Sequence, residues 1–157
     1  MYKQNATARR HPASSNRVLA SLNEERSALG AALLDAQQAA ELLEAATADF
    51  FTYEAYRHVF EAMQRLAPPY DANVIASELE RAGLFYRVGW ACLVSLEDGV
   101  VTALPMSRRL DRLRDLWQLR EIRTLLNSTH KQIQEPFSTA VDTIAAIRQR
   151  LGEIESR

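Results

Sequence analysis

Only a few side chains in this sequence are of the types that carry out catalysis. The carboxylate pairs Glu24-Glu25 and Glu97-Asp98 could serve as a general acid and a general base, and His58 could transfer a proton. Both pairs fall at predicted helix ends, where interaction with the helix dipole or with water accounts for them. No Ser, Cys or Asp stands at a spacing typical of a nucleophile triad with His58. We therefore predict no catalytic residues in this chain.

Metal and phosphate chemistry also lacks the residues that it needs. Cys92 is the single cysteine, and its apolar neighbours predict a small buried side chain. The three histidines are scattered, at His11, His58 and His130, so the sequence holds no zinc-ligand cluster. The five glycines never cluster, and neither G-x-x-x-x-G-K-[ST] nor G-x-G-x-x-G occurs. The sequence predicts no metal site and no cofactor site in this chain.

A row of arginines within residues 107–134 is the one pattern suited to nucleic acid. Arginines contact phosphates, but acidic residues are interleaved here at spacings that suit ion pairs within one helix. A solvated, salt-bridged face is the favoured interpretation, and a small DNA-binding helical protein is the third of three functional interpretations. The arginines are Arg108, Arg109, Arg112, Arg114, Arg120 and Arg123, and the acidic residues are Asp111, Asp115 and Glu121.

The composition is that of a packed protein of modest size. With 157 residues and 17.7 kDa, the chain has the length of one domain, or of a head with a short appendage. Its 47% hydrophobic and 25% charged residues exclude overall disorder. No apolar run approaches the roughly 18 to 20 residues of a membrane span, and the N-terminus lacks the apolar core of a signal peptide. We expect a cytoplasmic protein that does not contact a membrane.

The net charge of −1 is divided unevenly along the chain. Residues 1–19 contain four basic residues and no acidic one, which gives +4. Residues 20–100 contain five basic and thirteen acidic residues, which gives −8, and residues 101–157 contain ten basic and seven acidic, which gives +3. This division suits head-to-tail self-association or the docking of a basic partner, although a solvated surface would also tolerate it.

The hydrophobic pattern predicts an all-α fold in three segments. Residues 1–20 mix small polar and basic side chains without periodicity, which predicts a mobile basic arm. Residues 21–104 predict a small helical head of five to six helices, and residues 105–157 predict a helical hairpin. No segment alternates with the period of two that marks a strand. The residues expected in the core of the head are Leu29, Phe50, Phe60 and Leu79.

Capping signals suggest where the helices of the head begin and end. Ser21-x-x-Glu24 forms a capping box, so the first helix is predicted to start at Ser21. Asp35 and Thr52 are placed to cap the second and third helices, and Gly83 is expected in the left-handed conformation after the fourth. The third to fifth helices are predicted to cover residues 53–66, 74–82 and 88–96.

The predicted hairpin carries more apolar surface than its own two helices can bury. One long helix is expected over residues 107–134, and after Pro136 a second helix is expected to start at a cap formed by Ser138 or Thr139. The excess surface must meet either the head or another protomer, and the second case would make the protein an oligomer. The candidate interface residues are Trp117, Ile122, Ile144, Ile147 and Leu151.

Several strings, in collinear order over residues 22–125, together resemble the N-terminal domain of bacterial replicative DNA helicases of the DnaB family. Residues 23–35, NEERSALGAALLD, are similar to the opening helix of that domain, E-A-E-x-A-V-L-G-A-x-L-L-D. Residues 49–51 and 56–63 resemble its D-F-Y and H-R-x-I-F-x-A-M strings, and residues 116–122, LWQLREI, resemble its L-R-x-L element. Asp71, residues 78–84 and Val88-Gly89 resemble its D-x-x-T-x-x-x-x-L-x-x-x-G-x-L-x-x-x-G-G stretch, and the departures are Tyr56 for His, Val74 for Thr and Trp90 for the second Gly.

The resemblance implies a helical head and hairpin that assemble. In the DnaB family these units pair into dimers, and three dimers form a six-chain collar above the motor ring. This collar also receives the helicase-binding domain of primase. The chain is thus expected to associate with itself, as a dimer or a trimer of dimers, and to dock a primase or a helicase loader. DNA would be contacted only indirectly, and ATP and Mg²⁺ would belong to a motor domain elsewhere in the gene. The alternative function is a free-standing adaptor or inhibitor of this fold that binds a helicase or a primase.

Overall fold

The computed structural model describes residues 13–98 and 104–157, with side chains described from Leu22 onward. All regular secondary structure in these two ranges is helical. The elements are α1 (Ala13–Leu34), α2 (Ala36–Ala45), the 3₁₀ helix η1 (Ala48–Phe50), α3 (Glu54–Arg65), α4 (Ala72–Arg81), α5 (Phe85–Glu97), α6 (Met106–Ile133) and α7 (Ala140–Glu155). The predicted all-α class is therefore confirmed.

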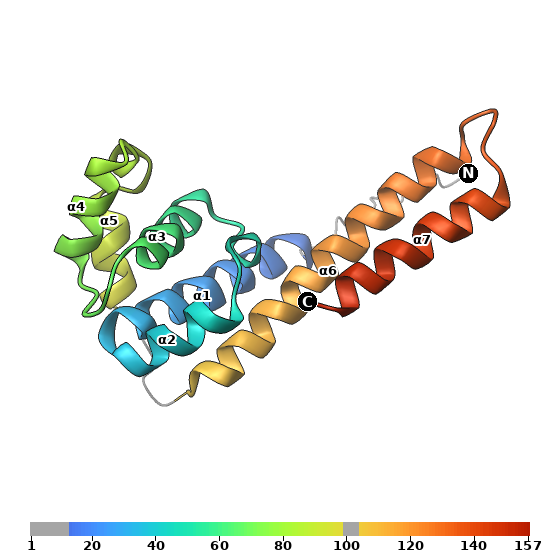
Figure 1. Cartoon of the computed structure of the whole chain (residues 1–157). Coiled ribbons are helices and arrows are strands. Elements are labelled where there is room, and N and C mark those ends of the chain that lie inside the picture. The colour runs from blue at the N-terminus through green and yellow to red at the C-terminus, as the bar shows by residue number, and fades with distance from the viewer. Residues whose placement is uncertain (1–12, 99–103) are drawn as a thin grey trace, which may run out of the picture.

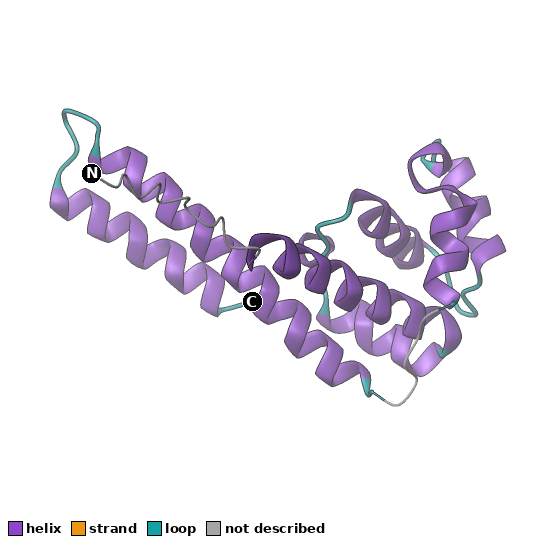
Figure 2. Ribbon diagram, turned by 180° about the vertical axis from the view of Figure 1, so that it is seen from behind, coloured by secondary structure: helices purple, strands orange, loops and turns teal. Residues whose placement is uncertain are grey.

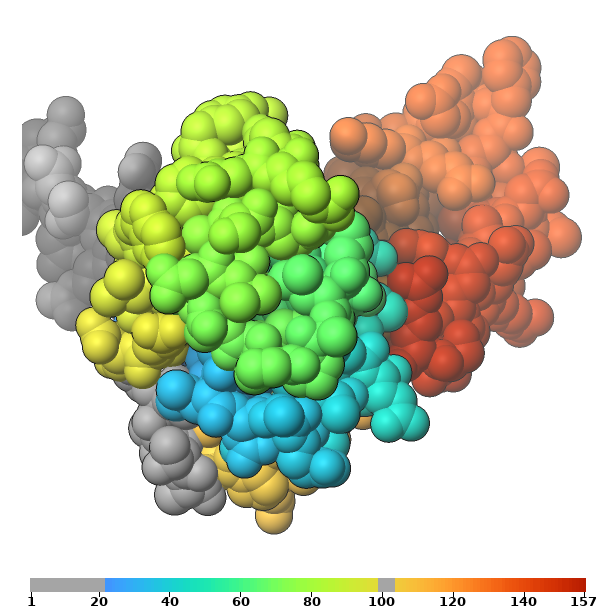
Figure 3. Space-filling view, turned by 60° about the vertical axis from the view of Figure 1, so that its left-hand side comes forward, coloured from blue at the N-terminus to red at the C-terminus, as the bar shows by residue number. Residues whose placement is uncertain are grey.

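The helices form a head and a protruding hairpin, as predicted (Figure 1). Helices α1 to α5 make the head, in which α1 contacts α2, α3 and α5. The first half of α6 packs along α1 and α2, and its second half continues beyond the head beside the antiparallel α7 (Figures 1 and 2). In the space-filling view the hairpin extends away from the bulk of the head (Figure 3).

Side-chain caps fix the starts of three helices. The Asp35 carboxylate accepts hydrogen bonds from the backbone N–H groups of Gln37 and Gln38, at 2.8 and 3.0 Å, so its predicted role is confirmed. Asp71 caps α4 in the same way. At the start of α7, the Thr139 hydroxyl accepts a hydrogen bond from the Asp142 N–H at 3.1 Å. Thr139 is thus the cap among the two predicted candidates.

Two predicted helix starts are wrong. The first helix begins at Ala13 rather than Ser21, so the capping box lies inside α1. Residues 13–20 contain neither glycine nor proline, and Pro12 immediately before them is well tolerated at a helix start. The predicted arm therefore overlaps α1 over residues 13–20, and residues 1–12 lie outside the described residues. The third helix begins at Glu54 with Tyr53 as its cap residue, and the Thr52 hydroxyl instead donates to the Glu25 carboxylate.

Two glycines of the head adopt conformations that other residues avoid. Gly83 has a φ of 68° after α4, which confirms the expected left-handed residue. Gly89 has a φ of 72° and a ψ of 158°, so α5 consists of two helical segments joined at a kink. The predicted helix over residues 88–96 therefore misses the first of these segments, which begins at Phe85.

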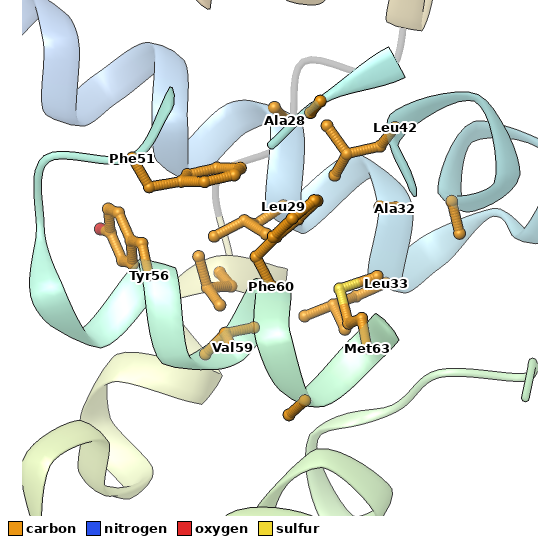
Figure 4. Packing of buried hydrophobic residues seen from close by; sticks show 14 of the residues in the cluster. Ala28, Leu29, Ala32, Leu33, Leu42, Phe51, Tyr56, Val59, Phe60 and Met63 are labelled. Atoms are coloured by element: carbon orange, nitrogen blue, oxygen red, sulfur yellow. The ribbon is translucent and has the colours of Figure 1, made fainter. Parts of the chain in front are cut away.

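The core of the head joins α1, α2 and α3 (Figure 4). Leu29 of α1 and Leu42 of α2 pack near Phe60 of α3, whose ring lies 5.0 Å between centroids from the ring of Phe51 in the segment before α3. Burial of each large apolar side chain contributes about 1.5 to 3 kcal/mol. The four predicted core residues, Leu29, Phe50, Phe60 and Leu79, are all at most 1% exposed, which confirms their placement.

Candidate assembly surface

The hairpin is attached to the head at the middle of α6. Trp117, which is 4% exposed, packs against Phe50 of η1 with ring centroids 5.7 Å apart. The Arg120 guanidinium donates to the carbonyl oxygens of Asp49 and Phe50, at 3.1 and 2.8 Å. From α7, Ile154 is buried at the same junction. These contacts fix the direction in which the second half of α6 leaves the head.

A buried carboxylate supports this junction. Glu25 of α1 is fully buried, accepts a hydrogen bond from the backbone N–H of Tyr53 at 3.2 Å, and accepts another from the Thr52 hydroxyl. Burial lowers the pKa of the Arg120 guanidinium, and the nearby charge of Glu25 acts in the opposite direction. The two opposite charges therefore help to keep α1, α6 and the segment before α3 together.

Replacement of Arg120 tests the junction. Arg120→Met keeps the aliphatic length but removes both donors from the η1 carbonyls and a positive charge near Glu25. We expect the free energy of unfolding in urea to fall by about 2 kcal/mol, the usual cost of leaving partly buried acceptors without a charged donor. The matched control is Arg123→Met, at an exposed arginine on the same helix. Equal losses for the two variants would show that Arg120 does not hold the junction.

Beyond the junction, the hairpin exposes a row of apolar side chains on each helix, which we call the hairpin stripe. Its members are between 36% and 76% exposed, although side chains of these types are usually buried. The fully projecting Phe137, 96% exposed, adds an aromatic ring at the tip. The stripe consists of Leu119, Ile122, Leu126 and Ile133 on α6 and of Val141, Ile144 and Leu151 on α7.

The two rows of the stripe lie on the same side of the hairpin. On α6 the row is about a quarter turn away from Gln118 and Glu121, which contact α7, when positions are counted at about 100° per residue. On α7 the row is also about a quarter turn around the helix axis from Arg150 and Ile154, which contact α6. The turn has the same direction on both helices when each is viewed from its N-terminus. Because the helices are antiparallel, equal offsets bring both rows to one face.

The spacing of the stripe is that of helices which pack against other helices. On α6, Leu119, Ile122, Leu126 and Ile133 follow the three-and-four spacing of a heptad seam, with the half-buried Thr129 at the remaining seam position. On α7 the same spacing joins the three stripe residues through Arg148. A face of this kind can form a seam with the helices of another chain.

The five predicted interface residues do not all lie on one surface. Ile122, Ile144 and Leu151 belong to the hairpin stripe. Trp117 packs against the head, which is the alternative to another protomer that the sequence left open for the excess apolar surface. Ile147 is half-buried on the side of α7 that faces α6. Sequence reasoning did not select Leu126, Ile133 or Val141 as interface residues. The seven-residue spacing of Leu119, Leu126 and Ile133 was the signal that could have identified the row.

The other candidate residues contact neighbouring side chains within the chain. Arg109 is 2% exposed and donates to the Ser27 hydroxyl, and Arg112 lies 3.8 Å from Glu24. Arg114 pairs with Asp111 at 3.8 Å, and together with Arg120 four of the six arginines of the row have partners within the chain, which argues against a DNA track. His58 lies within 3.5 Å of carboxylates on its own helix, and burial raises the pKa of the Cys92 thiol.

Within residues 13–98 and 104–157, no group of His, Cys, Asp and Glu is arranged to hold a metal ion. In the same ranges, no helix has the length and hydropathy of a membrane span.

Comparison with known proteins agrees with this arrangement of a head and a hairpin. The sequence profile of the DnaB-like helicase N-terminal domain matches residues 18–115, which is more than half of the chain. The chain belongs to the DnaB-like helicase N-terminal domain family. The crystal structure of the N-terminal domain of DnaB helicase from Mycobacterium tuberculosis superposes with a TM-score of 0.75 at 26% sequence identity, and the match covers 83% of this chain and 95% of that one. Because this share exceeds the head, the match to the DnaB domain must include residues of the hairpin.

Proposed function

We propose that this chain is the collar and oligomerisation domain of a DnaB-type replicative helicase and is not itself catalytic. The observation that carries the proposal is the hairpin stripe, a largely apolar face with heptad spacing whose seven apolar side chains are exposed in the described part of the chain. In an isologous pair, the stripe of one hairpin packs against the same stripe of a second copy. The known assembly of the family, dimers joined into a six-chain collar, supports this pairing.

The proposal assigns docking of a primase or a helicase loader to the assembled domain. Family membership supports this assignment, since the collar of related helicases receives the helicase-binding domain of primase. Contact with DNA would then be indirect, through the motor domain and its partners. ATP and Mg²⁺ would likewise act in a motor domain, and the primosome would assemble in the cytoplasm.

Sedimentation of the isolated chain over a wide concentration range tests self-association. We expect the average mass to rise with concentration from that of a monomer toward that of a dimer or a trimer of dimers. The driving force is removal of the stripe from water, at about 25 cal/mol for each Å² of apolar surface. A strictly monomeric chain at the highest attainable concentration would contradict the proposal.

A further inference from the structure

A charged side chain interrupts the hairpin stripe on α7. Arg148 stands in the row of stripe residues, four positions after Ile144 and three before Leu151. It is exposed, and within the described part of the chain it forms no ion pair with a carboxylate. The row is therefore apolar on both sides of a single cation, which stands at a position that a helical seam would bury.

A second arginine lies at the same level of the hairpin. Glu121 of α6 binds Arg150 of α7, and the two helices are antiparallel (Figure 1). Two residues further along α6 and two residues back along α7 therefore come to the same level, and these residues are Arg123 and Arg148. Arg123 directly follows Ile122 at the border of the α6 row, is exposed, and likewise has no ion pair in the described ranges.

The stripe offers no free carboxylate to neutralise these cations. Over residues 119–133 the one acidic residue is Glu121, which is engaged across the hairpin. Over residues 141–151 the one acidic residue is Asp142, which accepts a hydrogen bond from the Thr139 hydroxyl at 2.6 Å. In an isologous contact the same residues come from both sides. The contact then gathers cations from both copies and supplies no carboxylate to pair with them.

We propose that Arg148 limits the strength of hairpin pairing and keeps it reversible. The inference rests on the proposed function, because it requires that the stripes of two copies meet. A guanidinium in the row must either lose hydration or turn aside and leave its seam position unfilled, whereas an apolar side chain there would add to the contact. A polar residue at one seam position lowers the stability of paired helices and restricts the states that they form. Arg123 adds positive charge from the edge of the row.

Sedimentation of Arg148→Leu beside the wild type tests this limit. Leucine completes the apolar row, and an isologous contact contains the position twice, so we expect the dissociation constant of pairing to fall at least about tenfold. Arg148→Gln removes the charge without completing the row and should lower the dissociation constant about threefold. The second variant decides the question if Arg148→Leu aggregates. Pairing of the wild type should also strengthen as salt rises from about 0.05 M to about 0.5 M, because screening weakens the repulsion between cations.

The matched control is Lys131→Leu, which also exchanges a cation for leucine. Lys131 is exposed and lies on the opposite side of α6 from the stripe, so the dissociation constant should stay within about twofold of the wild type. Equal affinities of the wild type and both Arg148 variants overturn the inference and leave the collar intact, and equal tightening by Lys131→Leu also overturns it. A monomeric wild type with a pairing Arg148→Leu variant supports the limit but contradicts the proposed self-association. If all these proteins stay monomeric, both proposals are overturned.

Discussion

Phe60→Ala is expected to lower the free energy of unfolding by about 3 to 5 kcal/mol. The Phe60 side chain is fully buried in the core of the head and packs against Phe51, with ring centroids 5.0 Å apart. Truncation removes the transfer free energy of the ring and leaves a cavity that the surrounding helices can fill only in part. Urea denaturation followed by circular dichroism gives the value, and a loss of this size approaches the total stability of many small domains.

Arg112→Ala is the control for this prediction. The Arg112 side chain is 69% exposed, and its guanidinium lies 3.8 Å from the Glu24 carboxylate. An exposed ion pair at this distance contributes little, so we expect a change within about 0.5 kcal/mol. Equal small losses for both variants would mean that Phe60 does not belong to the core.

The helical pattern of the head could be predicted because local chemistry determines it. Asp35 caps α2 through the two backbone N–H groups that directly follow it, and a contact of this kind is visible in a sequence window of a few residues. Local spacing likewise predicts that Thr52 caps α3, but the Thr52 hydroxyl donates to Glu25, 27 residues earlier in the chain. A competing partner that lies so far away in the chain cannot be inferred from local spacing.

The neighbouring residues Glu24 and Glu25 show the same limit. In the sequence they form one solvated pair, but successive residues on a helix point about 100° apart. Glu25 is consequently fully buried beside η1, whereas Glu24 remains partly exposed and faces Arg112. The segment before α3, which donates two hydrogen bonds to Glu25, makes this carboxylate the structural one.

The candidate assembly surface could be predicted only in part for a related reason. The apolar residues of α6 look alike in the sequence, but the side chain of Trp117 is buried against the head, whereas those of Leu119 and the later stripe residues are exposed. Periodicity reveals an excess of apolar surface without showing where the head stops covering it. Trp117 was therefore grouped with residues of the free half, although it anchors the hairpin to Phe50.

The central claim is that the hairpin stripe joins copies of this chain. It is tested most directly by sedimentation velocity of a double variant, Leu126→Asp with Ile144→Asp, in which both changed positions are exposed in the single chain. The matched control is Thr124→Asp with Ala146→Asp, which adds the same charge to exposed positions on the opposite face of the same two helices.

All three proteins should have the same unfolding midpoint in dilute solution, because the substitutions avoid the core. The wild type and the opposite-face control should associate alike. The stripe variant should remain monomeric at concentrations where they assemble, with a dissociation constant raised about a hundredfold or more, because two carboxylates would lose their hydration in the contact. Association of the stripe variant with the affinity of the wild type would contradict the account.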